Sequence, residues 1–215
     1  MADMLVRNPS EAQLLEGTVG HFNQYKGPLG TVLDIGAHVG ELSVAAAQRG
    51  AKRVWAVEPD AENYRLLVIN ILANEYADRI IPLQMAVWIQ NGVVALKKVS
   101  GNTGQRSLLY QPSVVRASEI VPGVTLEALL SWTGPVDYMK LDIEGAEHLV
   151  LQSVDPAVMR QVKVLDLDLH DVTHPEYFEG QDIDQERTRA CLRSFGFPIG
   201  ERQHQNEWMM LERKE

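Results

Sequence analysis

The sequence has almost no cysteine, no long apolar run and no surplus of positive charge. Its 215 residues include a single cysteine, Cys191, which excludes an internal disulfide framework and favours a reducing compartment. No run reaches the roughly 20 apolar residues of a membrane span, and the first residues lack the apolar core of a signal peptide. We therefore expect a cytoplasmic protein that makes no use of a membrane.

The charge balance argues against a polynucleotide as partner. The chain has 20 lysine and arginine residues against 29 acidic residues, a formal net charge of −9. Proteins held on nucleic acid by phosphate contacts usually present a basic face, whereas the basic residues here are scattered along the chain. A small-molecule partner is therefore favoured, and the oligomeric state stays open.

The length fits one domain after a short lead-in. Residues 1–30 contain a helical pattern that stops at a Gly27-Pro28 break, and residues 31–215 form a single domain in which strand-like and helix-like segments alternate. This alternation predicts an α/β fold with a mostly parallel, seven-stranded sheet and helices on both faces. Residues 196–199 and 207–211 are expected to close the chain as an antiparallel hairpin.

The most informative pattern lies in residues 31–59. An apolar run ends at Asp34, Gly36 and Gly40 frame a turn into an alanine-rich helical pattern, and a second β-like run ends at Glu58. Rossmann-like folds use such a unit to hold an adenosine group. Glycines let the backbone approach the ligand, and the Glu58 carboxylate can accept hydrogen bonds from both ribose hydroxyls.

The glycine spacing favours a cationic ligand over a dinucleotide. Dinucleotide sites usually have G-x-G-x-x-G, which lets a helix N-terminus receive a pyrophosphate. The turn here is D-I-G-A-H-V-G, with His38 at the position of the second glycine. A carboxylate at Asp34 repels a phosphate but suits an amino group, and S-adenosylmethionine carries both an ammonium and a sulfonium. An NAD(P)-dependent Rossmann oxidoreductase, which shares the unit, is the alternative.

Acidic residues follow a second strand-like segment. Residues 136–151, VDYMKLDIEGAEHLVL, place Asp142 at the end of a strand and Glu144 and Glu147 where a helix begins. Ligands of open α/β sheets bind outside the carboxyl ends of the strands, so Asp142 is expected to share a crevice with the acids of the first unit. We interpret Asp142 as functional and Glu147 as support for the start of the helix.

A third group of polar residues lies on the strand-like residues 162–169 and just beyond. Alternation places Asp166, Asp168 and His170 on one face of this strand, near its carboxyl end. If the acceptor of the reaction is a hydroxyl, a base is expected near it, because a free hydroxyl is a weak nucleophile at neutral pH. A divalent metal such as Mg²⁺ is the alternative and is not favoured, so no metal ligand is assigned. The residues that could hold it are Asp142, Glu144, Asp168 and His170.

Residues 100–122 show little regular pattern and contain clustered glycines. A long irregular stretch in a compact domain is often a functional lid. We predict that this segment is a mobile lid, with Asn102, Thr103 and Ser107 facing the cofactor or the acceptor.

Four motifs together resemble the FkbM family of S-adenosylmethionine-dependent methyltransferases, and the similarity covers most of the chain. The resemblance implies the class I methyltransferase (Rossmann-like) fold. It also implies methyl transfer to an oxygen, typically a hydroxyl on a sugar, polyketide or other small metabolite. The motifs are D-I-G-A-H-V-G-E-L-S at residues 34–43, V-E-P at 57–59, N-I-L-A-N at 70–74 and V-D-Y-M-K-L-D-I-E-G-A-E at 136–147.

These arguments define a candidate site for S-adenosylmethionine and a small-molecule acceptor. Asp142 and Glu144 are expected at the active centre, with His170 as the base or the group that orients it. An RNA or protein acceptor is the alternative within the same chemistry. The candidate cofactor-binding residues are Asp34, Gly36, Ala37, His38, Gly40, Glu58, Pro59, Ala86 and Asp142.

Overall fold

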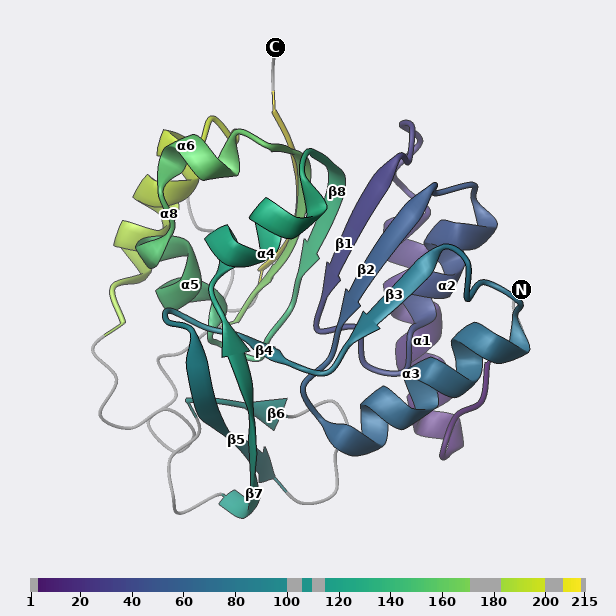
Figure 1. Ribbon diagram of the computed structural model, residues 1–215. Helices are drawn as coiled ribbons and strands as arrows, with labels where there is room; N and C mark the ends of the chain where they lie inside the picture. Colours follow the sequence, from purple (N-terminus) through teal and green to yellow (C-terminus); the bar gives the residue numbers. More distant parts are fainter. Residues whose placement is uncertain (1–3, 100–105, 110–114, 171–182, 200–206, 214–215) are drawn as a thin grey trace.

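The computed structural model describes residues 4–99, 106–109, 115–170, 183–199 and 207–213, and these form two sheets with helices around the larger one (Figure 1). The main sheet has the strand order β10-β9-β8-β1-β2-β3. Its neighbouring strands are parallel, except for the antiparallel pair of β9 and β10. The strands are β1 (Thr31–Ile35), β2 (Arg53–Val57), β3 (Ile80–Leu83), β8 (Val136–Leu141), β9 (Val162–Leu169) and β10 (Glu207–Glu212).

Helices cover both faces of the main sheet, as the alternation predicts. Strand periodicity divides the core: Val32 packs with α1, α2 and α3, whereas Leu33 and Ile35 pack with the later helices. Asp60 caps α3, because its carboxylate accepts from the backbone N–H groups of Glu62 and Asn63. The helices are α1 (Pro9–Phe22), α2 (Glu41–Gln48), α3 (Ala61–Ala73), α4 (Leu126–Thr133), α5 (Glu147–Ser153), α6 (Pro156–Met159) and α8 (Gln185–Ser194).

Two details of the predicted sheet differ. Within the described residues the main sheet has six strands rather than seven, because predicted strand material after β3 builds a second sheet. The antiparallel C-terminal strand is present, but β10 pairs with β9 rather than with residues 196–199. Those residues follow α8 without strand pairing, and Phe197 packs into the core instead. Periodicity indicates a strand, whereas its pairing depends on tertiary packing.

The second sheet lies at the carboxyl ends of the main strands (Figure 1). Its order is β4-β7-β5-β6. The prediction of an irregular stretch over residues 100–122 is wrong where β7 forms a long antiparallel ladder with β5. Asn102 and Thr103 lie outside the described residues. The strands are β4 (Ala86–Val87), β5 (Gly92–Val99), β6 (Arg106–Ser107) and β7 (Val115–Val124).

The described helices do not meet the requirements of a membrane span. In that part of the chain, none is both long enough and apolar enough to cross a bilayer.

Candidate active site

A cavity of about 360 Å³ opens between the carboxyl ends of the main strands and the second sheet. Most of the predicted site residues line it, so residues at the ends of several strands contribute to one cavity. The predicted residues among them are Gly36, His38, Glu58, Pro59, Ala86, Asp142, Glu144, Asp168 and His170. The lining also includes residues that were not predicted as site residues, among them Thr18, Glu41, Asn63, Met85, Arg106, Lys140 and Trp208.

Asp34 is placed differently from the expectation. It is fully buried on β1 and is not among the residues that line the cavity, and neither are Ala37 and Gly40. One carboxylate oxygen accepts from the Ser43 hydroxyl at 2.6 Å, and burial raises the pKa of Asp34 to about 6. Strand alternation turns this side chain toward α2, so Asp34 supports the glycine turn from the side of α2 and does not face the cavity.

The glycine turn brings the ends of β1, β2 and β8 together. Gly36 has φ 82°, and a Cβ there would lie 1.8 Å from the carbonyl oxygen of Asp142. The backbone N–H groups of Gly36 and Ala37 both donate to the Val57 carbonyl at 3.0 Å. A side chain at position 36 would therefore separate β1 from the loop that carries Asp142.

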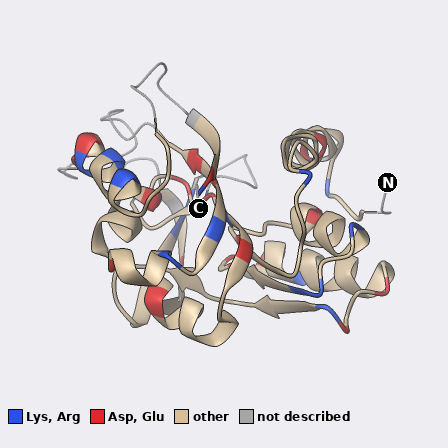
Figure 2. Cartoon of the chain, turned by 90° about the horizontal axis from the view of Figure 1, so that it is seen from above, with Lys and Arg blue, Asp and Glu red and all other residues tan. Residues whose placement is uncertain are grey.

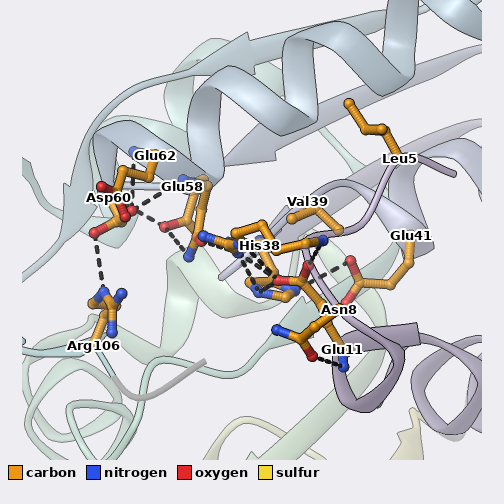
Figure 3. Close-up of polar contacts among 12 residues, drawn as sticks. Leu5, Asn8, Glu11, His38, Val39, Glu41, Glu58, Asp60, Glu62 and Arg106 are labelled. Carbon is orange, nitrogen blue, oxygen red and sulfur yellow. Dashed lines mark hydrogen bonds and ion pairs between the residues drawn. The ribbon is translucent and has the colours of Figure 1, made fainter. Parts of the chain in front are cut away.

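Glu58 extends from the end of β2 into the turn (Figure 3). One oxygen accepts from the His38 backbone N–H and the other from the Asp60 backbone N–H, each at 2.9 Å. Burial raises the pKa of Glu58 to about 7 even though these bonds favour the charged form. The carboxylate is thus held in one orientation at the cavity wall, with further lone pairs able to accept from a ligand.

Polar side chains from the lead-in segment hold His38 in place (Figure 3). His38 has φ 50°, which is uncommon for a residue with a Cβ. Its Nε2 lies 3.2 Å from Glu11 of α1, and its Nδ1 lies 3.8 Å from Glu41 of α2. Arg7 pairs with Glu11 at 2.5 Å and donates to Asn63 at 2.7 Å. The lead-in helix therefore takes part in the site, and no sequence motif indicates this.

Lys140 and Asp142 form a charged pair at the end of β8. The Lys140 ammonium lies 3.0 Å from the Asp142 carboxylate and also donates to the Gly36 carbonyl at 3.0 Å. Burial raises the pKa of Asp142, but the charge of Lys140 outweighs it and the net pKa is lowered. Asp142 is therefore ionised, and its side chain remains 25% exposed. The K-x-D spacing puts both residues on one face of a strand, and this pattern could have identified Lys140 as a site residue from the sequence.

The loop after β8 is held by Glu147. This fully buried carboxylate accepts from the backbone N–H of Ile143 at 2.5 Å and of Gly145 at 2.8 Å. Glu144 has φ 56°, and the Ser107 hydroxyl of the second sheet donates to its carbonyl at 2.6 Å. Ser107 thus supports the active-site loop, and the Glu144 side chain lines the cavity.

His170, just after β9, lies among carboxylates. Its ring nitrogens are 3.4 Å from Glu147 and 3.7 Å from Glu144. Burial lowers the pKa of His170, but the charge of Glu147 and the other acids outweighs this effect and raises the pKa to about 11. His170 is therefore a cation at neutral pH, which suits an orienting role better than that of a base.

Asp168 and Asp166 have different surroundings on the same face of β9. Burial raises the pKa of Asp168 to about 6, and Asp168 lines the cavity. Asp142, Asp168 and His170 each offer one ligand atom, all within 4.8 Å of one another, so they could hold a metal ion. Asp166 is fully buried and accepts from the Tyr138 hydroxyl and the Trp208 indole, which is a structural role.

The fold is that of class I methyltransferases. Solved structures with a TM-score of 0.50 include the ribosomal protein L11 methylase from Lactobacillus delbrueckii subsp. bulgaricus (15% identity, covering 99% of this chain and 82% of that one). Another is magnesium protoporphyrin IX methyltransferase from Synechocystis PCC 6803 with bound S-adenosylmethionine (TM-score 0.50, 14% identity, 95% and 80% coverage). The M. capricolum TrmK complex with S-adenosylhomocysteine also has a TM-score of 0.50 (8% identity, 91% and 67% coverage). At these identities the likeness concerns the fold.

The family follows from the sequence. The model of the methyltransferase FkbM domain matches residues 34–199, and the chain therefore belongs to the FkbM methyltransferase family. A shorter match, 47% identical over 51 residues, is to the ribosomal protein L11 methyltransferase of Geobacter sp. (strain M21). It spans 24% of this chain and 17% of that relative. The family match weighs against the nicotinamide-dependent oxidoreductase that shares the first unit.

Proposed function

We propose that the protein transfers the methyl group of S-adenosylmethionine to a hydroxyl of a small molecule, such as a sugar or another metabolite. The observation that carries this proposal is the convergence of Asp142, Asp168 and His170 beside the glycine turn. The methyl donor is already activated, so the enzyme must orient the acceptor and remove its proton. Carboxylates next to the cofactor cavity supply both functions.

The cofactor position is proposed from the cavity wall. Glu58 would accept from the ribose hydroxyls, and the turn at Gly36 would let the backbone approach the ligand. Pro59, Met85 and Ala86 also line the cavity and offer mostly apolar surface to the adenine. This arrangement would direct the sulfonium methyl toward the loop that carries Asp142.

The acceptor hydroxyl is proposed to bind across Asp142 and Asp168. Asp142 is ionised and held by Lys140, which suits it to position the hydroxyl and receive its proton. Asp168 offers a second carboxylate in the same cavity. The cation of His170 lies between Glu144 and Glu147 and would keep these two glutamates in place.

A small acceptor is favoured over a macromolecule by charge. Figure 2 shows the basic and acidic positions of the described residues interspersed rather than sorted onto separate sides. With a net charge of −9, the chain lacks the excess of basic residues typical of proteins held on nucleic acid by phosphate contacts. A protein acceptor is less affected by this argument and is the main alternative.

Methyl-labelled S-adenosylmethionine tests the proposal. The protein is incubated with a metabolite extract, with RNA and with a protein fraction, and each mixture is separated by size. We expect label in small molecules, as a methyl ether that withstands mild base. Label confined to RNA or protein would contradict the proposed acceptor. Repeating the assay with a chelator and with added Mg²⁺ tests a divalent cation at Asp142, Asp168 and His170, which the converging ligand atoms also permit.

A further inference from the structure

The amino-acid end of the proposed cofactor needs an anionic partner, and the expected one is not accessible. Asp34 is fully buried and is not part of the cavity wall. We infer that Glu41, together with Nδ1 of His38, binds the ammonium group of S-adenosylmethionine. The inference rests on the proposed cofactor and adds a binding residue that neither the motifs nor the resemblance assigned.

Glu41 has the properties of a carboxylate that awaits a cation. It is the first residue of α2, is only 6% exposed and lines the cavity. Its Oε2 atom is buried and has no hydrogen-bond partner in the described part of the protein. The nearby His38 Nδ1 is 3.8 Å away, beyond hydrogen-bonding distance. A buried carboxylate oxygen without a donor is costly, so a ligand that supplies donors would be favoured.

His38 offers a second acceptor toward the same gap. Its Nε2 lies 3.2 Å from Glu11, so in the neutral ring the proton belongs on Nε2 and Nδ1 is left as an acceptor. Nδ1 is also buried and lacks a hydrogen-bond partner among the described residues. An ammonium carries three donors and no acceptor, which allows it to bond to both atoms.

The surrounding charge favours a cation at this point. Burial lowers the pKa of His38, but Glu41, Glu58 and Glu11 outweigh it and raise the pKa above the ordinary value. The same acids would attract a ligand ammonium, which would take the place of the added proton of the His38 ring and leave Nδ1 as an acceptor. The His38 backbone also donates to Glu58, so one residue would set the spacing between the ribose contact and the ammonium contact (Figure 3).

Two ligands that differ at the amino-acid end test the inference by titration calorimetry. S-adenosylhomocysteine has the ammonium, whereas 5′-methylthioadenosine lacks the whole amino-acid group. Glu41→Gln should weaken S-adenosylhomocysteine binding by about tenfold or more, the usual effect of losing a charge-assisted hydrogen bond. Binding of 5′-methylthioadenosine should stay within about twofold, which also shows that the variant is folded. The matched control is Glu62→Gln, an exposed acid in the first turn of α3, which should change neither affinity.

A wild-type measurement makes the test independent of how the variant folds. A deaminated analogue of S-adenosylhomocysteine, which keeps the carboxylate, should bind no better than 5′-methylthioadenosine. Unchanged S-adenosylhomocysteine binding by Glu41→Gln, or equal loss of both ligands, would overturn the inference. If the wild-type protein bound neither ligand, the proposed cofactor itself would fail. Loss confined to the ammonium-bearing ligand supports the role of Glu41 whatever the methyl acceptor is.

Discussion

Among single residues, burial and partners separate the two acids of the loop after β8. Asp142 faces the cavity and is held by Lys140, whereas Glu147 is fully buried and accepts from the backbone of its own loop. The sequence places both acids in one motif, D-I-E-G-A-E, and assigns chemistry to the first and support to the second. This division of roles is a prediction that enzymology can test.

We predict that Asp142→Asn lowers methyl transfer by roughly 10² or more, because the amide keeps the shape but loses the basicity and charge of the carboxylate. Cofactor binding should persist. Glu147→Gln should mainly lower the free energy of unfolding, by about 1 to 3 kcal/mol, because an amide NH₂ would face a backbone N–H. Single-turnover rates and thermal unfolding of both variants provide the measurements. Near-normal transfer by Asp142→Asn would remove it from the chemistry and direct attention to Asp168 and His170.

The raised pKa of Glu58 predicts a pH dependence of cofactor binding. With a pKa of about 7 in the free protein, the carboxylate is increasingly protonated below neutrality. Ribose hydroxyls donate to the ionised form, so S-adenosylhomocysteine should bind more weakly at pH 6 than at pH 8. In the protein without ligand, the free energy of unfolding should also fall as the pH rises toward 7, because the buried Glu58 carboxylate is then ionised. Calorimetry across this range is the measurement, and Glu58→Gln should bind weakly with a flatter profile. An equally steep profile in the variant would assign the effect to another group.

Among the elements, the glycine turn joins the cofactor wall to the active-site loop. A Cβ at Gly36 would lie 1.8 Å from the Asp142 carbonyl, and its positive φ adds strain for any other residue. We predict that Gly36→Ala lowers the thermal midpoint and abolishes binding of S-adenosylhomocysteine. Gly17→Ala on α1 is the control, since a Cβ there meets nothing within 4 Å and alanine favours a helix. Full stability and binding in Gly36→Ala would show that β1 and the loop that carries Asp142 can move apart without loss of stability or affinity.

At the scale of the whole molecule, the ligand that stabilises the fold identifies the cofactor class. A ligand that binds only the folded state at about 100 times its dissociation constant adds about 2.7 kcal/mol to the free energy of unfolding. S-adenosylhomocysteine should therefore raise the thermal midpoint, and NAD should not, because the turn lacks the phosphate-binding glycines. Stabilisation by NAD alone would contradict the cofactor assignment and restore the oxidoreductase alternative.

The sequence by itself determined the order of the elements and the crevice at the strand ends. Apolar runs that end at Glu58 and Asp142 indicate two strands followed by acids, and parallel strands present their carboxyl ends at one edge of a sheet. The cap at Asp60 is equally local, because an N-cap contacts the residues just after it. Such features depend on neighbours a few positions away, which a single sequence displays.

Only the tertiary structure decided which side chains face the cavity and which lie beneath it. Asp34 and Glu41 both belong to the glycine-turn motif, yet only Glu41 lines the cavity, because packing of α2 against β1 covers the other acid. The contact between Glu11 and His38 joins residues 27 positions apart, and no motif links them. The second sheet likewise depends on the pairing of β5 with β7. Strand pairing and side-chain direction depend on neighbours that the chain brings together only after folding.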